Sequence, residues 1–383
     1  MQVRRLQKED YSQLIGLLNY VFTLHNKREM DFEKELPKMC VQDDENMQKH
    51  LGVFESGKLV AVLGAYPLKA KVLEEELLVY TVGNIATHPE FEGKGYMQAL
   101  LTRAMQELDE KGADISRLGG IRQRYERFGY EPCGMIYEFR LTGENVQRVF
   151  QSEEEICFEE ITREDRENLK IASELLKKEK FYVERKEENA YFETYASMTA
   201  WRNKPYIAKM GNKILGYLCV SPNGSNIAEC FAYGKEEMIT MLCGWQRRIG
   251  QTVSFGFQPH RIESIRWATS VCQNVSIVIP SQFKIVNFEK TVRAFMKLKA
   301  SYTELPKGEL KIYIENYGGL RLYVDENGAG CEKYNGECDI SLTALEATRY
   351  LFGPLPPETV ANANTTATAW LPLPLSWNLQ DRV

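Results

Sequence analysis

The stretch VGNIATHPEFEGKGYM, residues 82–97, decides the fold of this chain. It begins as an apolar strand, continues through a loop with glycines at positions 93 and 95, and enters a helix with one apolar face. The apolar face consists of Met97, Leu100, Leu101, Ala104, Met105 and Leu108. A helix that starts after a glycine loop offers unpaired backbone N–H groups and a positive dipole end, which suit a pyrophosphate. An ordinary strand-to-helix turn is the alternative interpretation, because glycine is common there too.

The segments around this stretch predict an α/β fold with mixed sheets. Strands are expected at residues 2–6, 51–55, 59–66, 77–86, 114–118 and 136–141, and helices after residues 8–10, from about 96 to 108, and at 122–128. A second segment begins in the same way, since a strand at 158–161 precedes Arg163-Glu164-Asp165 as the first strand precedes Lys8-Glu9-Asp10. We therefore expect an internal duplication. From about Phe283 the pattern changes to a helix at 288–298, short strands at 310–315 and 319–324, and a helix ending near Leu351.

Composition narrows the class of protein. The 383 residues, 44% hydrophobic and 26% charged, are enough for two or three globular domains. A net charge of −5 without a basic run argues against nucleic acid as a partner, and the apolar runs are too short to span a membrane. Nine cysteines without a CxxC pair and four scattered histidines argue against a metal site. We expect reduced thiols and a cytoplasmic protein.

The end of the chain is unusually apolar for a terminus. Trp370 and Trp377 flank a proline-rich run close to the last residue, Val383. Disordered tails are polar, so this one is expected to be docked on the protein.

A second motif, GGIRQRYERFGY at residues 119–130, identifies a family. The loop at Gly93–Gly95 resembles the acetyl-CoA loop of the GNAT superfamily (GCN5-related N-acetyltransferases). The second motif resembles a segment of the enhanced-intracellular-survival (Eis) acetyltransferases that ends in Tyr-x-Arg-Phe-Gly-Tyr. The resemblance implies tandem GNAT folds, the first active (1–150) and the second degenerate (151–283), followed by a domain like sterol carrier protein 2 (SCP2-like, 284–383) that carries the docked tail.

The resemblance also implies a chemistry, in which acetyl-CoA is the co-substrate and no metal takes part. The acetyl-CoA site is expected to comprise Ile85, Ala86, Thr87, Gly93, Lys94, Gly95, Tyr96, Met97, Gln98, Gly120 and Ile121. Backbone N–H groups near Ile85 to Thr87 would hold the thioester carbonyl and stabilise the oxyanion. Tyr125 would protonate the leaving thiolate, since a phenol is protonated at neutral pH. The alternative interpretation of Tyr125 is a half-buried aromatic residue with a structural role. Tyr130 is the other candidate for the acid, and we interpret it as a core residue.

The resemblance assigns the base to the terminal carboxylate, that of Val383, acting through water on the incoming amine. The alternative is an ordinary surface terminus behind an apolar anchor. The acceptor is expected to be a primary amine: an aminoglycoside, a polyamine or a lysine side chain. Family members form oligomers, so a homo-oligomer, a hexamer or a trimer-based assembly, is expected.

The second segment differs at the corresponding helix start. After a strand at 227–232 the chain has one glycine, Gly234, followed by Glu236 and Glu237. Carboxylates there satisfy the helix dipole and repel a pyrophosphate, so we predict that this domain binds no CoA. The competing function is a non-catalytic carrier that holds an apolar ligand in the sterol-carrier-like domain, although a filled core is the stronger expectation there.

Overall fold

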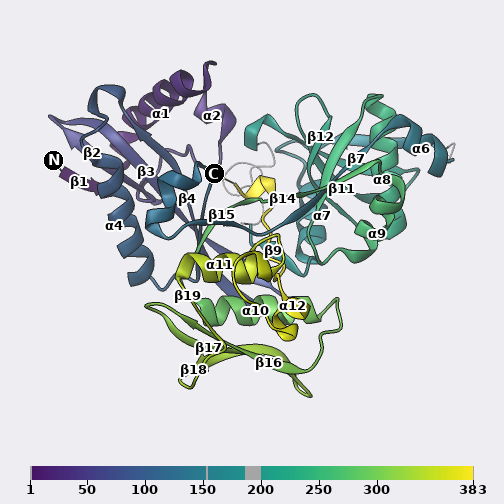
Figure 1. Ribbon diagram of the computed structural model, residues 1–383. Helices are drawn as coiled ribbons and strands as arrows, with labels where there is room; N and C mark the ends of the chain where they lie inside the picture. Colours follow the sequence, from purple (N-terminus) through teal and green to yellow (C-terminus); the bar gives the residue numbers. More distant parts are fainter. Residues whose placement is uncertain (1, 152–153, 186–199, 383) are drawn as a thin grey trace. The chain divides into compact units, whose positions relative to one another are not determined.

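The computed structural model describes residues 2–151, 154–185 and 200–382. The chain divides into two compact units, each assembled from separate stretches of sequence (Figure 1). The first unit combines residues 1–133 with 281–373, and the second combines 134–280 with 374–382. None of the helices in the described ranges has the length and apolarity needed to cross a membrane.

The first unit is built on a mixed sheet. In spatial order its strands are β1 (Gln2–Arg5), β2 (His50–Glu55), β3 (Lys58–Val72), β4 (Glu75–Thr87), β5 (Ile115–Leu118), β15 (Ser281–Ile285) and β6 (Glu131–Cys133). Along this path β4 and β5 pair in parallel, and the other neighbours pair antiparallel. The helical segments before residue 133 are η1 (Lys8–Asp10), α1 (Tyr11–Asn26), α2 (Phe32–Glu35), α3 (Asp44–Met47), η2 (Pro89–Phe91), α4 (Tyr96–Glu110), α5 (Arg122–Tyr125) and η3 (Glu126–Phe128).

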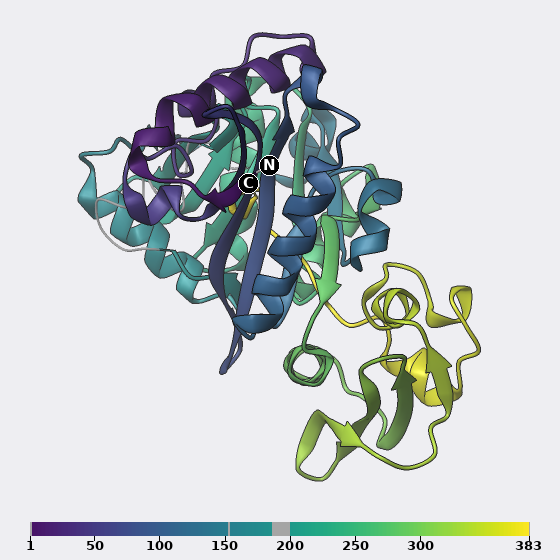
Figure 2. The same ribbon diagram turned by 90° about the vertical axis from the view of Figure 1, so that its left-hand side faces the viewer.

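Helix α4 confirms the predicted apolar face. Leu100, Leu101, Ala104 and Leu108 are almost fully buried against β2, β3 and β4, while Met97 is half-buried at the edge of the contact. Helices α1 and α4 flank the long strands β3 and β4 (Figure 2). The packing therefore fixes the direction in which the first turn of α4 points.

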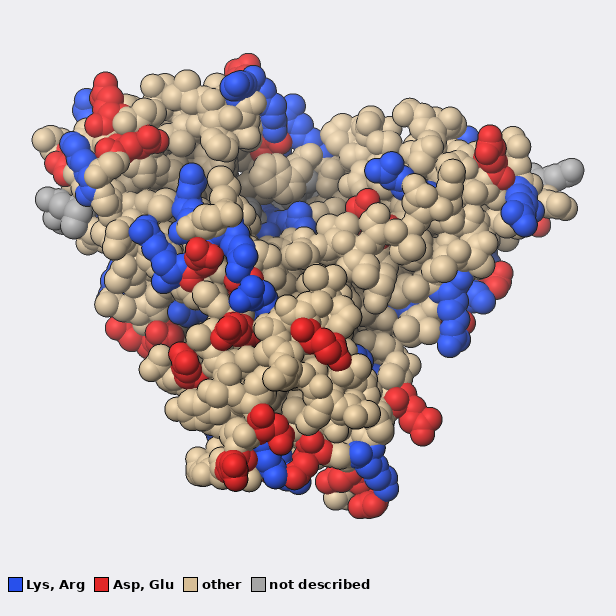
Figure 3. All heavy atoms as spheres, viewed as in Figure 1, with Lys and Arg blue, Asp and Glu red and all other residues tan. Residues whose placement is uncertain are grey.

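The same unit carries a second, smaller sheet from the C-terminal part of the chain. Its strands run in the order β18 (Gly328–Tyr334), β17 (Gly318–Asp325), β16 (Gly308–Ile314) and β19 (Ile340–Leu342). The helical segments here are α10 (Phe288–Ala300), α11 (Ala344–Phe352), η6 (Pro357–Thr359) and α12 (Thr365–Trp370). Leu310, Ile312 and Leu322 of the sheet and Phe295 of α10 are buried. Arg321 of β17 forms ion pairs with Glu309 and Glu332. Figure 3 shows acidic and basic side chains close together on the visible face.

The second unit repeats the topology of the first sheet. Its strands are ordered β14 (Asn274–Val278), β7 (Ile136–Leu141), β13 (Val253–Phe257), β12 (Asn226–Ala232), β11 (Lys213–Val220), β10 (Lys204–Met210) and β8 (Ile156–Glu160). β12 and β13 pair in parallel, as β4 and β5 do. Its other elements are α6 (Gly143–Val149), α7 (Arg166–Lys177), β9 (Phe181–Val183), η5 (Ala200–Arg202), α8 (Lys235–Ile249), α9 (Ile262–Val271) and η7 (Leu379–Asp381). The expected duplication, and with it the mixed α/β tandem fold, is confirmed.

One strand prediction was wrong about its partner. Residues 136–141 do form a strand, β7, but it does not complete the first sheet; it pairs with β13 and β14 of the second unit. The corresponding place beside β5 is taken by β15, which follows the whole second segment in sequence. Each sheet therefore contains a strand from beyond its own segment. Domain boundaries at about 150 and 283, and the sterol-carrier likeness of residues 284–383, stay predictions.

The C-terminal tail is docked, as predicted. Trp370 is fully buried, and its indole N–H donates to the carbonyl oxygen of Pro306 at 3.0 Å within the first unit. Trp377 is 1% exposed, and its indole donates to the carbonyl of Asp381 within the second unit. Between them, the carbonyl of Leu375 accepts from the N–H of Met135 at 2.8 Å. The tail is thus part of the core up to its last described residues.

Candidate active site

The candidate site is built at the carboxyl ends of the parallel strands β4 and β5. The two strands pair from Val79↔Ile115 to Val82↔Leu118 and then separate, while β4 continues beside β3 as far as Thr87. The strand ends lead directly into the two sequence motifs, Gly93–Gly95 after β4 and Gly119–Gly120 after β5. Ligands of α/β sheets bind in the crevice outside such strand ends. The fold therefore brings both motifs to one edge of the sheet.

A bulge in β4 accompanies this separation. Gly83 pairs with Gly64 and Ala86 pairs with Val62, so Asn84 and Ile85 together face a single residue of β3. Asn84 has a φ of 51°, in the left-handed region that asparagine tolerates better than most side chains. Sequence analysis missed the bulge, although a Gly-Asn pair inside a predicted strand is a signal for one.

The start of α4 is open and its first N–H groups are unpaired. Gly93 and Gly95 have φ angles of 76° and 79°, and a Cβ at either position would have no atom within 4 Å. Gly95 is the N-cap and offers no side chain to cap the helix. Within the described part of the chain, the N–H groups of residues 93–98 donate to no protein atom, and the first bond of the helix is Ala99 N–H to the Gly95 carbonyl. Unpaired N–H groups and the helix dipole both favour a bound anion here.

The predicted acetyl-CoA residues fall into three groups. Ile85, Ala86 and Thr87 lie on β4 beyond the bulge. Gly93, Lys94, Gly95, Tyr96, Met97 and Gln98 form the loop and the first turn of α4. Gly120 and Ile121 follow β5 and are exposed, Ile121 to 55%. The side chain of Tyr96 donates a hydrogen bond to Glu55 of β2, so its predicted contribution at the helix start is its backbone N–H.

Tyr125 ends α5 and lies in the core cluster that also contains Val82 of β4. Gly120 provides room for its ring, because a Cβ on Gly120 would lie 2.6 Å from a ring carbon of Tyr125. Burial raises the pKa of the Tyr125 phenol, and the neighbouring Arg124 opposes that rise. The phenol is therefore protonated at neutral pH and can donate a proton.

Tyr130 has the character of a core residue. It is fully buried, and its hydroxyl is 2.6 Å from that of Ser116 on β5. Burial raises the pKa of its phenol far above the usual value.

Strand β15 supports the second motif, a role that sequence analysis did not predict. The side-chain amide of Gln282 donates to the carbonyl of Gly120 at 2.6 Å. Ser281 accepts from the Arg117 guanidinium at 2.7 Å and donates to the carbonyl of Leu118 at 2.9 Å. No local signal marks these residues, since they lie more than 160 positions from their partners.

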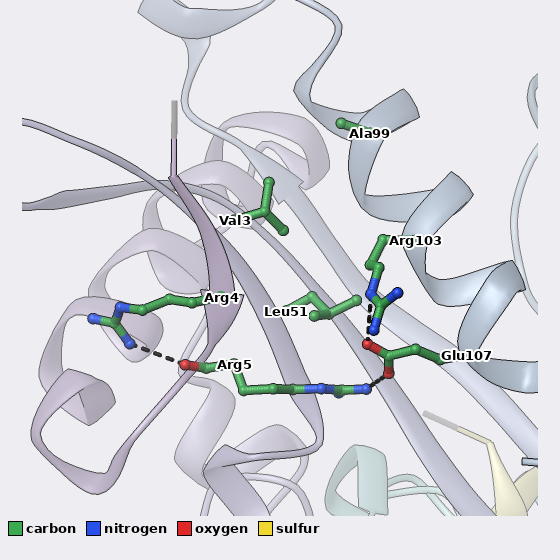
Figure 4. A pocket seen from close by; sticks show the side chains of 7 residues that line it. All are labelled: Val3, Arg4, Arg5, Leu51, Ala99, Arg103 and Glu107. Atoms are coloured by element: carbon green, nitrogen blue, oxygen red, sulfur yellow. Dashed lines mark hydrogen bonds and ion pairs between the residues drawn. The ribbon is translucent and has the colours of Figure 1, made fainter. Parts of the chain in front are cut away.

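A separate pocket of about 410 Å³ lies beside β1 and the flank of α4 (Figure 4). It is lined by Val3, Arg4, Arg5, Leu51, Ala99, Arg103 and Glu107. Arg5 and Arg103 both contact the carboxylate of Glu107, and Arg4 is paired with Asp10. The predicted acetyl-CoA residues are absent from this lining, so the pocket is distinct from the candidate site.

The corresponding helix start of the second unit is already capped. Glu237, the third helical residue of α8, pairs with Lys213 at 2.6 Å and accepts a hydrogen bond from its own N–H. These contacts lower the pKa of its carboxyl group. Its carboxylate also covers the N-cap, since a Cβ on Gly234 would lie 2.6 Å from it. Charge and space both disfavour an anion at this position, and the absence of CoA binding by this unit stays a prediction.

Val383, the predicted base, lies outside the described residues. The residues just before it are held in the second unit, where Asp381 pairs with Arg185 at 3.0 Å and Arg382 donates to the carbonyl of Pro280.

Comparison with known proteins defines the class. The profile of the acetyltransferase (GNAT) domain matches residues 2–133, the stretch that contains β4, the glycine loop and Tyr125. These residues are a GNAT acetyltransferase domain, and the protein is an N-acetyltransferase by class. No curated protein sequence matches the chain.

Solved structures extend the likeness to nearly the whole chain. Eis1 from Mycobacterium abscessus superimposes with a TM-score of 0.66 at 14% identity, covering 99% of this chain and 98% of that one. A GCN5-related N-acetyltransferase from Anabaena variabilis gives 0.68 at 15% identity, covering 98% of both chains. A conserved Enterococcus faecalis protein described as a probable N-acyltransferase gives 0.67 at 16% identity, covering 97% and 98%. At these identities the likeness concerns the fold, and the Eis-type architecture predicted from the motifs is confirmed in that sense.

Proposed function

We propose that the protein transfers the acetyl group of acetyl-CoA to a primary amine by direct attack, at the site in its first unit. The observation that carries this proposal is the open start of α4. There the N–H groups of residues 93–98 find no protein acceptor among the described residues, and both glycines leave room for phosphate oxygens. The residues present therefore fit the diphosphate of CoA.

The strand ends supply the electrophilic part of the site. Beyond Val82 the edge of β4 that faced β5 has no strand partner in the described part of the chain, so the backbone N–H groups among residues 85–87 that point to this edge are available to the thioester carbonyl. The N–H groups that alternate with them point to β3, as that of His88 does in donating to the carbonyl of Val60. Such donors stabilise the oxyanion that forms when the amine attacks. Fixed backbone donors are effective because they need no reorganisation during the reaction.

Tyr125 is proposed as the general acid for the departing thiolate. The phenol donates its proton to sulfur as the carbon–sulfur bond breaks, and its raised pKa keeps it protonated until then. Its position after β5 next to Gly120 supports the role that the family resemblance implies.

The terminal carboxylate of Val383 is proposed as the base that removes a proton from the incoming amine through water. The support for this role is the resemblance to Eis-type enzymes. Aminoglycosides, polyamines and lysine side chains are the proposed acceptors, and a homo-oligomer is the proposed assembly. All nine cysteines lie in the described ranges and are free thiols, which supports a cytoplasmic location.

The test is a calorimetric titration of the full chain with CoA, followed by an acetylation screen over polyamines, aminoglycosides and lysine peptides. The proposal predicts CoA binding and acetyl transfer to at least one amine class. A chain that binds no CoA would contradict the proposal and favour the carrier function expected of a sterol-carrier-like domain.

A further inference from the structure

The bulge of β4 is tied to the core by a chain of buried side chains. The amide Nδ2 of Asn84 donates to the hydroxyl of Tyr66 at 2.6 Å. That hydroxyl lies 2.8 Å from Nε2 of His50, and Nδ1 of His50 lies 3.1 Å from the carbonyl oxygen of Asn46. The chain thus runs from the bulge through β3 to the beginning of β2.

Each hydrogen in this chain has a definite place. The carbonyl of Asn46 can only accept, so Nδ1 of His50 carries the proton. Burial lowers the pKa of the His50 imidazole to about 4, so the ring is neutral at pH 7 and Nε2 accepts from the Tyr66 hydroxyl. The oxygen of Tyr66 is then left to accept from Asn84. A fully satisfied buried chain of this kind specifies one geometry.

The surroundings of Tyr66 are shaped for this arrangement. His50, Tyr66 and Asn84 are 0%, 1% and 6% exposed. Gly64, the partner of Gly83 at the edge of the bulge, lies under the tyrosine, because a Cβ there would be 2.2 Å from the hydroxyl oxygen. A larger residue at position 64 would displace the ring.

The bulge is also where the candidate chemistry begins. Asn84 holds a left-handed φ of 51°, and the N–H groups proposed to bind the acetyl carbonyl follow it at once. An error of about 1 Å in the placement of such groups costs up to about 100-fold in rate. Precise placement of the bulge therefore matters for turnover more than for binding of the nucleotide, which uses α4.

We propose that His50, Tyr66 and Asn84 are positioning residues that fix the β4 bulge and thereby align, with the acetyl carbonyl, the N–H groups among residues 85–87 that point away from β3. The proposal rests on the proposed acetyl transfer. It assigns a catalytic consequence to three side chains that do not touch the reacting atoms.

The first test is Tyr66→Phe, which removes the shared hydroxyl and keeps the ring. We expect kcat to fall about 10-fold or more, while KM for acetyl-CoA changes less than about twofold, because misalignment affects the transition state and leaves the anion site intact. Tyr350→Phe is the matched control, since it also removes a buried hydroxyl, one bonded to the carbonyl of Asn362. An unchanged kcat in Tyr66→Phe, or an equal loss in both variants, would overturn the proposal.

The second test uses substitutions that keep the fold. His50→Gln retains one donor and one acceptor and should keep most of the activity, whereas His50→Leu retains neither and should behave like Tyr66→Phe. Asn84→Gly permits the left-handed backbone and removes the amide, so it should also lower kcat selectively. Equal activity of His50→Gln and His50→Leu would show that the hydrogen bonds from Asn84 through Tyr66 to His50 have no positioning role.

Hydrogen exchange separates this inference from the proposed function. In Tyr66→Phe the amides of residues 83–87 should exchange faster than in the wild type, while those of α4 stay unchanged. If hydrogen exchange at residues 83–87 becomes faster but the wild type acetylates no amine, the proposed acetyl transfer is wrong. The hydrogen bonds of His50, Tyr66 and Asn84 would then have only a structural role. If the wild type is active and exchange does not respond, the positioning role is wrong.

Discussion

The starts of α4 and α8 occupy equivalent places in two sheets of the same topology, yet they differ in what they can bind. At α4 two glycines in the left-handed region leave the first N–H groups open, with no atom within 4 Å of either Cβ position. At α8 the N-cap glycine is extended and the carboxylate of Glu237 lies over it. The difference teaches that the fold supplies the helix end, whereas a few side chains decide whether that end is a site.

The two bulges differ in the same way. In β4 the bulge is held by hydrogen bonds between uncharged side chains, from Asn84 through Tyr66 to His50. In β12 the register also shifts, between Val220↔Ile227 and Cys219↔Glu229, next to the stretch paired with β13. There Glu229 forms a buried ion pair with Arg185, which also holds Asp381 of the tail. In the second unit this place holds the segment before the chain end through an ion pair.

The largest effect is expected from a variant that removes the ion pairs of Arg185 with Glu229 and Asp381. Arg185→Leu leaves two carboxylates buried without their cation, so the free energy of unfolding should fall by about 3–5 kcal/mol, measured by denaturant titration. Arg266→Leu is the matched control, because its pair with Glu263 is exposed and should contribute less than about 1 kcal/mol. Similar losses in the two variants would show that the buried pair is no anchor.

The next variants test which of the two tyrosines in the motif at residues 119–130 is the general acid. Tyr125→Phe should lower kcat by about 100-fold or more with little change in CoA affinity, because proton donation to the thiolate is lost. Tyr130→Phe should cost about 1 kcal/mol of stability and leave kcat within a few-fold. The reverse pattern in steady-state kinetics would make Tyr130 the acid.

A third variant closes the open helix start. Gly95→Val forces a β-branched side chain into a φ of 79°, and its methyl groups enter the anion site. The Kd for CoA should rise by about 100-fold, equivalent to about 2.7 kcal/mol. Gly250→Val in the second unit has a similar φ of 64° and similarly open surroundings, so it controls for strain. Equal loss of CoA binding in both variants would point to unfolding and not to a blocked site.

The smallest effect is expected from a variant that gives the start of α4 one feature of the start of α8. Gln98 and Glu237 are both third helical residues, so Gln98→Glu places a carboxylate at the end that should hold the diphosphate. CoA affinity should fall about 10-fold at low salt and recover partly at high salt, because the repulsion is electrostatic. Glu237→Gln should leave CoA binding unchanged. No loss in Gln98→Glu would argue against an anion at this position.

The features that lie close together in the chain could be predicted from the sequence. The glycine loop, the apolar face of α4 and the docked tail all follow from local spacing and composition. The exchange of β7 and β15 was missed, because an antiparallel strand carries no mark of a distant partner, and the paired residues Leu141 and Val253, or Leu118 and Gln282, lie far apart in the sequence. The hydrogen bonds that connect Asn84, Tyr66 and His50 were missed for the same reason. None of these residues stands out in the sequence of its own strand, and only the pairing of β2, β3 and β4 brings them together.

A crystal structure of the full chain grown with saturating CoA tests the central claim most directly. The account predicts one nucleotide per chain, with its diphosphate on the N–H groups of residues 93–98 and the start of α8 still closed by Glu237. A diphosphate at α8, or CoA bound elsewhere with the α4 loop empty, would contradict it.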